Sequence, residues 1–112
     1  MIAEIVRSIL YFITAAIFEI SGIYGVWIWF REGKTFIFAL MGFLSLLIYS
    51  IINTYQPAHF GRVYAAYGGV FVVMSILWGW KIDGISPDRF DIAGAGMIIF
   101  GVFTIMYARR IF

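Results

Sequence analysis

Four long apolar runs separated by three short polar breaks constrain this chain more than any other feature. The runs extend over residues 8–30, 35–55, 63–80 and 92–108, and Glu19 is the single charged residue inside them. The hydrocarbon core of a bilayer is about 30 Å thick, so one helical crossing needs about 20 apolar residues. Backbone groups in hydrocarbon must be hydrogen-bonded within the chain, which makes runs of this length helices. The sequence therefore predicts an all-α integral membrane protein with four transmembrane helices.

Composition agrees with this fold class and excludes several functions. The 112 residues are 63% hydrophobic and 12% charged, whereas typical soluble domains are about 25% charged. We expect one domain, residues 1–112, with no room for a soluble catalytic domain and hence no enzyme activity. Cysteine is absent, and no cluster of histidines or carboxylates and no glycine-rich phosphate loop is present. No metal, cofactor or nucleic-acid partner is expected.

The predicted helices cover about residues 8–30, 35–55, 63–80 and 88–108, and short breaks make consecutive helices antiparallel neighbours. The fourth starts before its apolar run, because Ser86-Pro87-Asp88 resembles an N-cap followed by a first-turn proline and an acid.

The basic residues do not select one orientation in the membrane. Four lie on the side of the termini and four on the other side. Those on the side of the termini are Arg7, Arg62, Arg109 and Arg110, and the others are Arg31, Lys34, Lys81 and Arg89. Orientation normally follows an excess of Lys and Arg on the cytoplasmic side. The tie favours insertion in both orientations, with a small masked bias as the alternative.

Glu19 is the strongest candidate functional residue. It stands in the middle of the 23-residue run from Ser8 to Phe30, with eleven residues on either side. A charge near the bilayer midplane costs at least ~2.5 kcal/mol, so such carboxylates usually bind a ligand or transfer protons.

The third apolar segment carries two patterns. Small residues recur at Gly61, Ala65 and Gly69, with Gly68 beside them, a spacing that allows two helices to approach closely in lipid. Tyr64, Tyr67 and Phe71 lie on a neighbouring face and could form an aromatic wall for an organic cation. Ordinary packing explains the same aromatic stripe equally well.

The second and fourth segments add a polar stripe and a glycine pair. Ser45, Tyr49 and Asn53 follow Gly42 on one helix face and are candidate substrate contacts, with interhelical hydrogen bonding as the alternative. Gly94 and Gly101 are one heptad apart and predict a close-packed seam, either within one chain or between two.

At Glu19, at Tyr64-Ala65-Ala66-Tyr67-Gly68-Gly69-Val70 and at Gly94 to Val102, the chain resembles the small multidrug resistance transporters. The stretch from Pro57 to Val70 is more similar to the related YnfA-like family. The chain differs from the multidrug pattern at Ile23, where that family has a hydroxyl residue, and at Arg62 in the second break. These differences concern the substrate class and leave the architecture unchanged.

This resemblance implies an antiparallel homodimer in the inner membrane of a prokaryotic cell that exports lipophilic or guanidinium-type cations against protons. Glu19 corresponds to the carboxylate shared by proton and substrate, and Tyr64 and Tyr67 to aromatic binding positions. Two alternatives stay open: a non-transporting membrane adaptor or assembly protein, and a transporter of a neutral or lipid-linked substrate.

Overall fold

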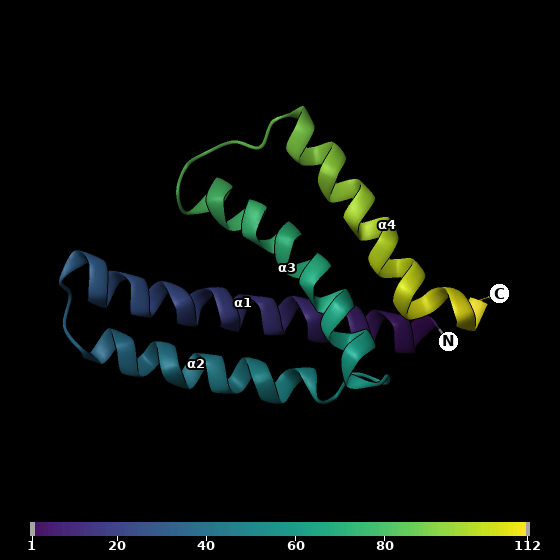
Figure 1. Ribbon diagram of the computed structural model, residues 1–112, viewed down its shortest axis with the longest axis horizontal. Helices are drawn as coiled ribbons and strands as arrows, with labels where there is room; N and C mark the ends of the chain where they lie inside the picture. Colours follow the sequence, from purple (N-terminus) through teal and green to yellow (C-terminus); the bar gives the residue numbers. More distant parts are fainter. Residues whose placement is uncertain (1, 112) are drawn as a thin grey trace. The chain divides into compact units, whose positions relative to one another are not determined.

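The computed structural model describes residues 2–111, apart from the side chain of Arg110, and over these residues it consists of four helices joined by short connections (Figure 1). The helices are α1 (Ile2–Glu32), α2 (Ile37–Asn53), α3 (Phe60–Lys81) and α4 (Arg89–Ile111). Three of them, α1, α3 and α4, are long and apolar enough to cross a membrane, and α2 is a shorter apolar helix of 17 residues. Seventeen residues is the lower end of the length that spans a bilayer, about 17–25 residues. The predicted fold class is confirmed.

The helix ends differ from the apolar runs because a run marks the membrane core and not the whole helix. α1 begins at Ile2 instead of near residue 8, with Glu4 in its first turn, where a carboxylate favours the helix dipole. α2 is shorter than its run, because Thr35 and Phe36 precede it and Thr54 and Tyr55 form a turn after it.

The start of α4 is capped by a different residue from the one that the sequence suggested. Asp88, and not Ser86, is the N-cap: its carbonyl accepts from the Ile92 amide at 3.1 Å. The Asp91 amide donates to the Asp88 carboxylate at 2.8 Å, and the Asp88 amide donates to the Asp91 carboxylate at 3.1 Å. This reciprocal pair has the pattern of a capping box, with Asp in place of the usual Glu. Pro87 therefore precedes the helix.

The chain divides into two compact units. One unit, here called the α1–α2 hairpin, is Leu10–Gln56, and the other, here called the α3–α4 unit, joins the chain up to Ile9 to the chain from Pro57 onwards.

Both α1 and α3 end in the same way. Gly33 and Gly84 have φ angles of 70° and 79°, and the amide of the next residue donates to a carbonyl six residues earlier, Lys34 to Ile28 and Ile85 to Gly79. Glycine allows this left-handed conformation without a steric cost.

In the α1–α2 hairpin, three glycines bring the two backbones close together. A Cβ atom added at Gly25 would lie 2.7 Å from the Phe38 carbonyl oxygen, and one added at Gly22 would lie 2.7 Å from the Gly42 carbonyl oxygen. A Cβ atom added at Gly42 would collide with the Gly22 carbonyl oxygen. Farther along, the Ser45 hydroxyl donates to the Phe18 carbonyl at 2.6 Å. Each contact farther along α2 meets an earlier residue of α1, so the two helices are antiparallel, as predicted.

In the α3–α4 unit, α3 packs against α4 with one glycine at the contact. A Cβ atom at Gly69 would collide with Val102 and come within 3.0 Å of Ile98. The buried residues of α3 follow the 3.6-residue helical period. They are Val63, Ala66, Tyr67 and Val70 on α3, with Val102, Met106 and Tyr107 buried on α4.

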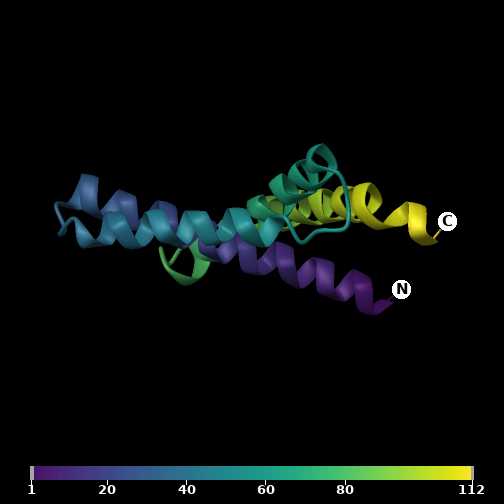
Figure 2. The same cartoon turned by 90° about the horizontal axis from the view of Figure 1, so that it is seen from below.

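The first turns of α1 belong to the same unit as α4. The Tyr107 hydroxyl donates to the Ser8 hydroxyl at 2.7 Å, and both residues are only 2% exposed. The start of α1 and the end of α4 accordingly lie at the same end of this unit (Figure 2). That placement is the one expected for a chain whose two termini emerge on one side of the membrane.

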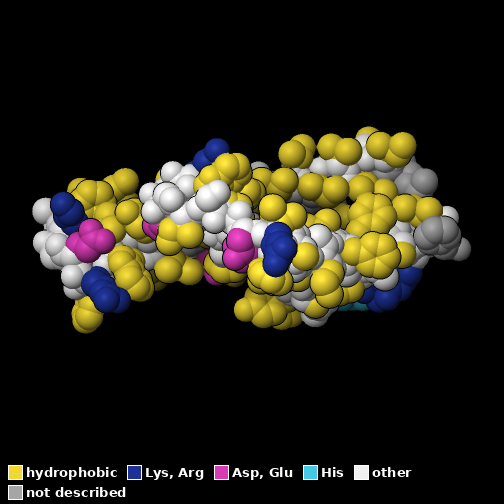
Figure 3. Space-filling model, turned by 90° about the horizontal axis from the view of Figure 1, so that it is seen from above, with side chains coloured by type: hydrophobic (Ala, Val, Ile, Leu, Met, Phe, Trp, Pro, Cys, Tyr) yellow, Lys and Arg dark blue, Asp and Glu magenta, His cyan; other side chains and the backbone are white. Residues whose placement is uncertain are grey.

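Much of the surface is apolar. Hydrophobic side chains cover most of the face seen in Figure 3, and charged side chains are sparse on it. Leu40, Phe43, Met97 and Phe100 are more than half exposed. Surface of this kind is covered by lipid or by another protein in the membrane.

The glycine contact of the hairpin predicts a large effect of one methyl group. Gly42→Ala should lower the free energy of unfolding by about 1–3 kcal/mol, because the new Cβ meets backbone atoms that have no room to move. Gly96→Ala is the matched control, because a Cβ at Gly96 meets nothing within 4 Å. Unfolding by SDS in mixed micelles, followed by circular dichroism, measures both. Equal stability of the two variants would contradict this close approach.

The hydrogen bond between Tyr107 and Ser8 predicts that the two side chains are coupled in their effect on stability, although they are 99 positions apart in the sequence. Tyr107→Phe and Ser8→Ala each remove one partner and should each cost about 1 kcal/mol of unfolding free energy. The double variant should lose clearly less than the two single variants together, because they break the same bond. A double-mutant cycle in the same micelles measures this coupling, and strict additivity would show that the two hydroxyls do not interact.

Candidate functional site

Glu19 lies on the buried stripe of α1. Residues at alternating spacings of four and three share one helix face, and on α1 this face contains Ser8, Phe12, Ala15, Glu19 and Gly22. The other four members are buried, with Phe12 1% and Ala15 0% exposed, and Glu19 is partly exposed. The carboxylate therefore stands on the face of α1 that packs within the protein.

Small residues surround this carboxylate along the helix. Ala15 and Ala16 precede Glu19 by about one turn, and Gly22 follows it by about one turn. None of these three carries more than a methyl group, whereas Ile23, which also follows Glu19 by about one turn, is larger.

α2 supports the backbone next to Glu19. The Ser45 hydroxyl, a predicted substrate contact, donates to the carbonyl of Phe18, the residue before Glu19. Interhelical hydrogen bonding, the alternative that the sequence left open, describes Ser45 in this structure. Such a bond fixes the register of α1 on α2 and, with it, the height of Glu19 along the hairpin.

The rest of the polar stripe on α2 also turns towards the packed side of that helix. Gly42 is buried, and Tyr49 and Asn53 are partly buried. The Asn53 Oδ1 atom is buried and accepts no hydrogen bond from the described residues. Near this end of the hairpin the Tyr11 and Tyr55 rings lie 5.9 Å apart. A substrate role for Tyr49 and Asn53 stays a prediction.

The aromatic residues of α3 separate into two pairs. Tyr67 is 2% exposed, and its ring lies 6.1 Å from that of Phe71. Tyr64 is 60% exposed and stacks on Phe60, with ring centroids 5.6 Å apart. The three predicted aromatic residues therefore do not form one continuous wall on a single buried face. These aromatics belong to the α3–α4 unit and Glu19 to the α1–α2 hairpin, so a cavity shared by Glu19, Tyr64 and Tyr67 stays a prediction.

The predicted packing glycines also separate. Gly69 is the one that packs against another helix of the chain. A Cβ at Gly61, Gly68, Gly94 or Gly101 would meet nothing within 4 Å, and Ala65 is exposed. A seam through Gly94 and Gly101 inside one chain is thus not observed, and their role in a dimer stays a prediction. The sequence analysis did not predict that Gly22 and Gly25 pack against α2. Their spacing of three residues, which places both on one helix face, could have indicated it.

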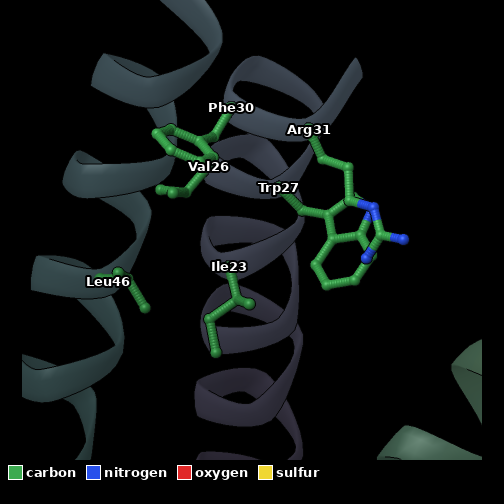
Figure 4. Close-up of a pocket in the computed structure, with 6 residues that line it drawn as sticks. All are labelled: Ile23, Val26, Trp27, Phe30, Arg31 and Leu46. Atoms are coloured by element: carbon green, nitrogen blue, oxygen red, sulfur yellow. The ribbon is translucent and has the colours of Figure 1, made fainter. Parts of the chain in front are cut away.

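An apolar groove begins one turn after Glu19. It has a volume of about 420 Å³ and lies on the α1–α2 hairpin (Figure 4). Its lining residues are Ile23, Val26, Trp27, Phe30, Arg31 and Leu46. The Arg31 guanidinium lies 4.9 Å from the centre of the Trp27 ring. A tryptophan beside a basic residue at a helix end is typical of the membrane–water boundary.

In residues 2–111, no three His, Asp or Glu side chains come together as metal ligands.

Comparison with known proteins agrees with the resemblance noted in the sequence. A family model described as "Uncharacterised BCR, YnfA/UPF0060 family" matches residues 5–111. A UPF0060 membrane protein of Clostridium beijerinckii is 59% identical over 109 residues, covering 96% of this chain and 98% of the relative. The UPF0060 membrane protein YfjF of Bacillus subtilis is 47% identical over 104 residues, covering 92% and 95%. No solved structure matches the chain. The chain is an integral membrane protein similar to bacterial membrane proteins, and it belongs to the YnfA/UPF0060 family.

Proposed function

We propose that this protein is a proton-coupled exporter of small organic or lipophilic cations, of the multidrug or guanidinium type, that works as an antiparallel homodimer. One observation carries the proposal. Glu19 is the single charge in the apolar part of the chain, and it occupies the packed face of α1 between small residues. Intramembrane carboxylates in such positions usually serve ion or substrate pathways.

Exchange follows from the electrostatics of this position. In a medium of low dielectric, a carboxylate without a compensating positive charge is unfavourable. A proton or a bound organic cation can each provide that compensation, and the second adds little once the first is present. Cation binding therefore expels the proton, and proton binding expels the cation. This is the coupling that an antiporter needs.

A second copy of the chain would complete the environment of Glu19. In one chain the Glu19 residue is partly exposed, and exposure of a charged residue to hydrocarbon is costly. The α4 face with Gly94 and Gly101 is open in a single chain, and small residues at this spacing suit a close contact between helices in lipid. The equal division of basic residues between the two sides is compatible with two copies of opposite orientation.

The aromatic and amide groups are the proposed substrate contacts. Tyr67 with Phe71, and Tyr64 with Phe60, are two aromatic pairs that could face an organic cation, whose charge interacts with the negative face of an aromatic ring. Asn53 Oδ1 is a buried acceptor available to a substrate N–H group.

A membrane assembly protein is the second candidate. It is favoured by the Ser45–Phe18 hydrogen bond, in which Ser45, a predicted substrate contact, serves helix packing instead. In that case Glu19 would hydrogen-bond a partner helix and no proton would move.

Replacement of the carboxylate separates the two candidates. Glu19→Gln keeps the size of the side chain but cannot exchange a proton, so uptake of ethidium or guanidinium driven by a proton gradient should fall to the level of protein-free liposomes. Glu4→Gln is the matched control, because Glu4 is exposed in the first turn of α1, and it should transport as the native protein does. Absence of proton-driven uptake by the native protein would rule out the exporter, and native transport by Glu19→Gln in both rate and pH dependence would rule out Glu19 as its coupling residue.

The proposed dimer contact gives a separate prediction. Gly101→Leu should weaken dimers by about tenfold, since a bulky side chain prevents the close approach of two helices. Gly79→Leu is the control, because a Cβ at Gly79 likewise meets nothing within 4 Å but Gly79 lies on α3. Fluorescence resonance energy transfer between labelled copies in lipid, measured against dilution, gives both affinities. Unchanged dimerisation of Gly101→Leu would remove α4 from the interface.

A further inference from the structure

The α3–α4 unit has a groove of its own where α3 ends and α4 begins. Its volume is about 430 Å³. The residues that matter here are Val73, Leu77, Trp80, Pro87, Asp91 and Ile92. Asp91 is the one charged residue in the lining, and most of the remaining lining is apolar. The groove thus combines a carboxylate, an aromatic ring and an apolar wall.

The carboxylate is held in position by the start of α4. Asp91 Oδ2 accepts the Asp88 amide at 3.1 Å, within the capping box. No basic side chain among the described residues is ion-paired with Asp91, although Lys81 and Arg89 are close in sequence. Arg89 instead lies over the Phe90 ring, at 5.0 Å from its centre. The second carboxylate oxygen of Asp91 is consequently open to a positively charged ligand.

Trp80 already interacts with a cation of the chain itself. The Lys81 Nζ atom lies 4.0 Å from the centre of its ring. An aromatic ring attracts an organic cation by the same interaction with its quadrupole. The contact with Lys81 shows that the Trp80 ring is accessible to a cation. Lys81 also carries the same charge as an incoming organic cation, which would repel Lys81 or displace it from the ring.

The groove lies at the boundary between membrane and water. Trp80 and Lys81 end α3, and Trp beside Lys is the usual composition at this depth. Residues 82–88 are not helical, and irregular backbone exposed to lipid does not occur inside the hydrocarbon region. Lipophilic cations collect at this depth, because their apolar part leaves water and their charge stays near it.

We propose that this groove is a peripheral binding site for lipophilic organic cations, with Asp91 as the counter-charge and Trp80 as the aromatic contact. The choice of organic cations as the ligand class rests on the proposed function. Binding there would hold a cation at the membrane boundary, at a site separate from Glu19.

The test uses tetraphenylphosphonium and full-length protein in nanodiscs of zwitterionic lipid, with binding to empty nanodiscs subtracted. All variants carry Glu19→Gln, which removes the central carboxylate and leaves the groove. We expect saturable binding that Asp91→Asn weakens by about three- to tenfold, the range of an ion pair or cation–π contact at a partly exposed site. Asn retains an oxygen that can accept the Asp88 amide, so the cap persists.

Matched variants separate the groove from surface charge in general. Asp83→Asn removes the same charge from the exposed loop outside the groove and should leave binding unchanged. Trp80→Leu should weaken binding. Lys81→Gln should strengthen it, whereas Arg89→Gln should not. Tetraphenylborate, an anion of the same shape, should bind less well than tetraphenylphosphonium.

Three results would overturn the site: no saturable binding in the Glu19→Gln protein, equal loss with Asp83→Asn and Asp91→Asn, or equal binding of tetraphenylborate. These results are independent of transport. Failure of the exporter appears as absence of proton-driven uptake by the native protein, and it leaves an Asp91-dependent binding site in place.

Discussion

The hydrocarbon core of a bilayer offers neither a hydrogen-bond partner to the backbone nor solvation to a charge, and this constraint governs the whole protein. It makes the four apolar runs helical. It also leaves Glu19, the single charge within those runs, on the packed face of α1 rather than among the large exposed apolar side chains. A carboxylate in that setting is stable only with a positive charge or a hydrogen-bond donor nearby. Proton and cation exchange at Glu19 is the proposed consequence.

Backbone proximity in the α1–α2 hairpin determines where the carboxylate stands. Gly22 and Gly42 remove side chains from the contact, so the two helices approach until backbone atoms meet. The Ser45–Phe18 hydrogen bond then fixes the register one residue before Glu19. Because hydrophobic burial does not drive helices together in lipid, close packing and interhelical hydrogen bonds of this kind carry the association. The residues that hold Glu19 in place are thus glycines and a serine.

The sequence predicted the class and number of the helices and the antiparallel pairing of α1 with α2, because apolar length is a strong signal in a membrane protein and the breaks between the runs are short. It predicted less well where helices end: Asp88 and Asp91 form the cap of α4 through two mutual hydrogen bonds, which a pattern built on Ser86 and Pro87 did not suggest. It also could not distinguish which small residues pack. Gly69 meets α4, whereas Gly61, Gly94 and Gly101 face open space, because the face that a helix buries depends on its neighbours. Tyr64 and Tyr67 differ in the same way, one exposed and one buried.

The most direct test of the account is the number of protons released when an organic cation binds. Purified protein in weakly buffered detergent solution is mixed with tetraphenylphosphonium at a series of pH values, and the released protons are counted against the bound cation. Exchange at Glu19 predicts that proton release accompanies cation binding in the native protein and is absent at all pH values in Glu19→Gln. Proton release that persists in Glu19→Gln, or binding to the native protein with no release at any pH, would contradict it.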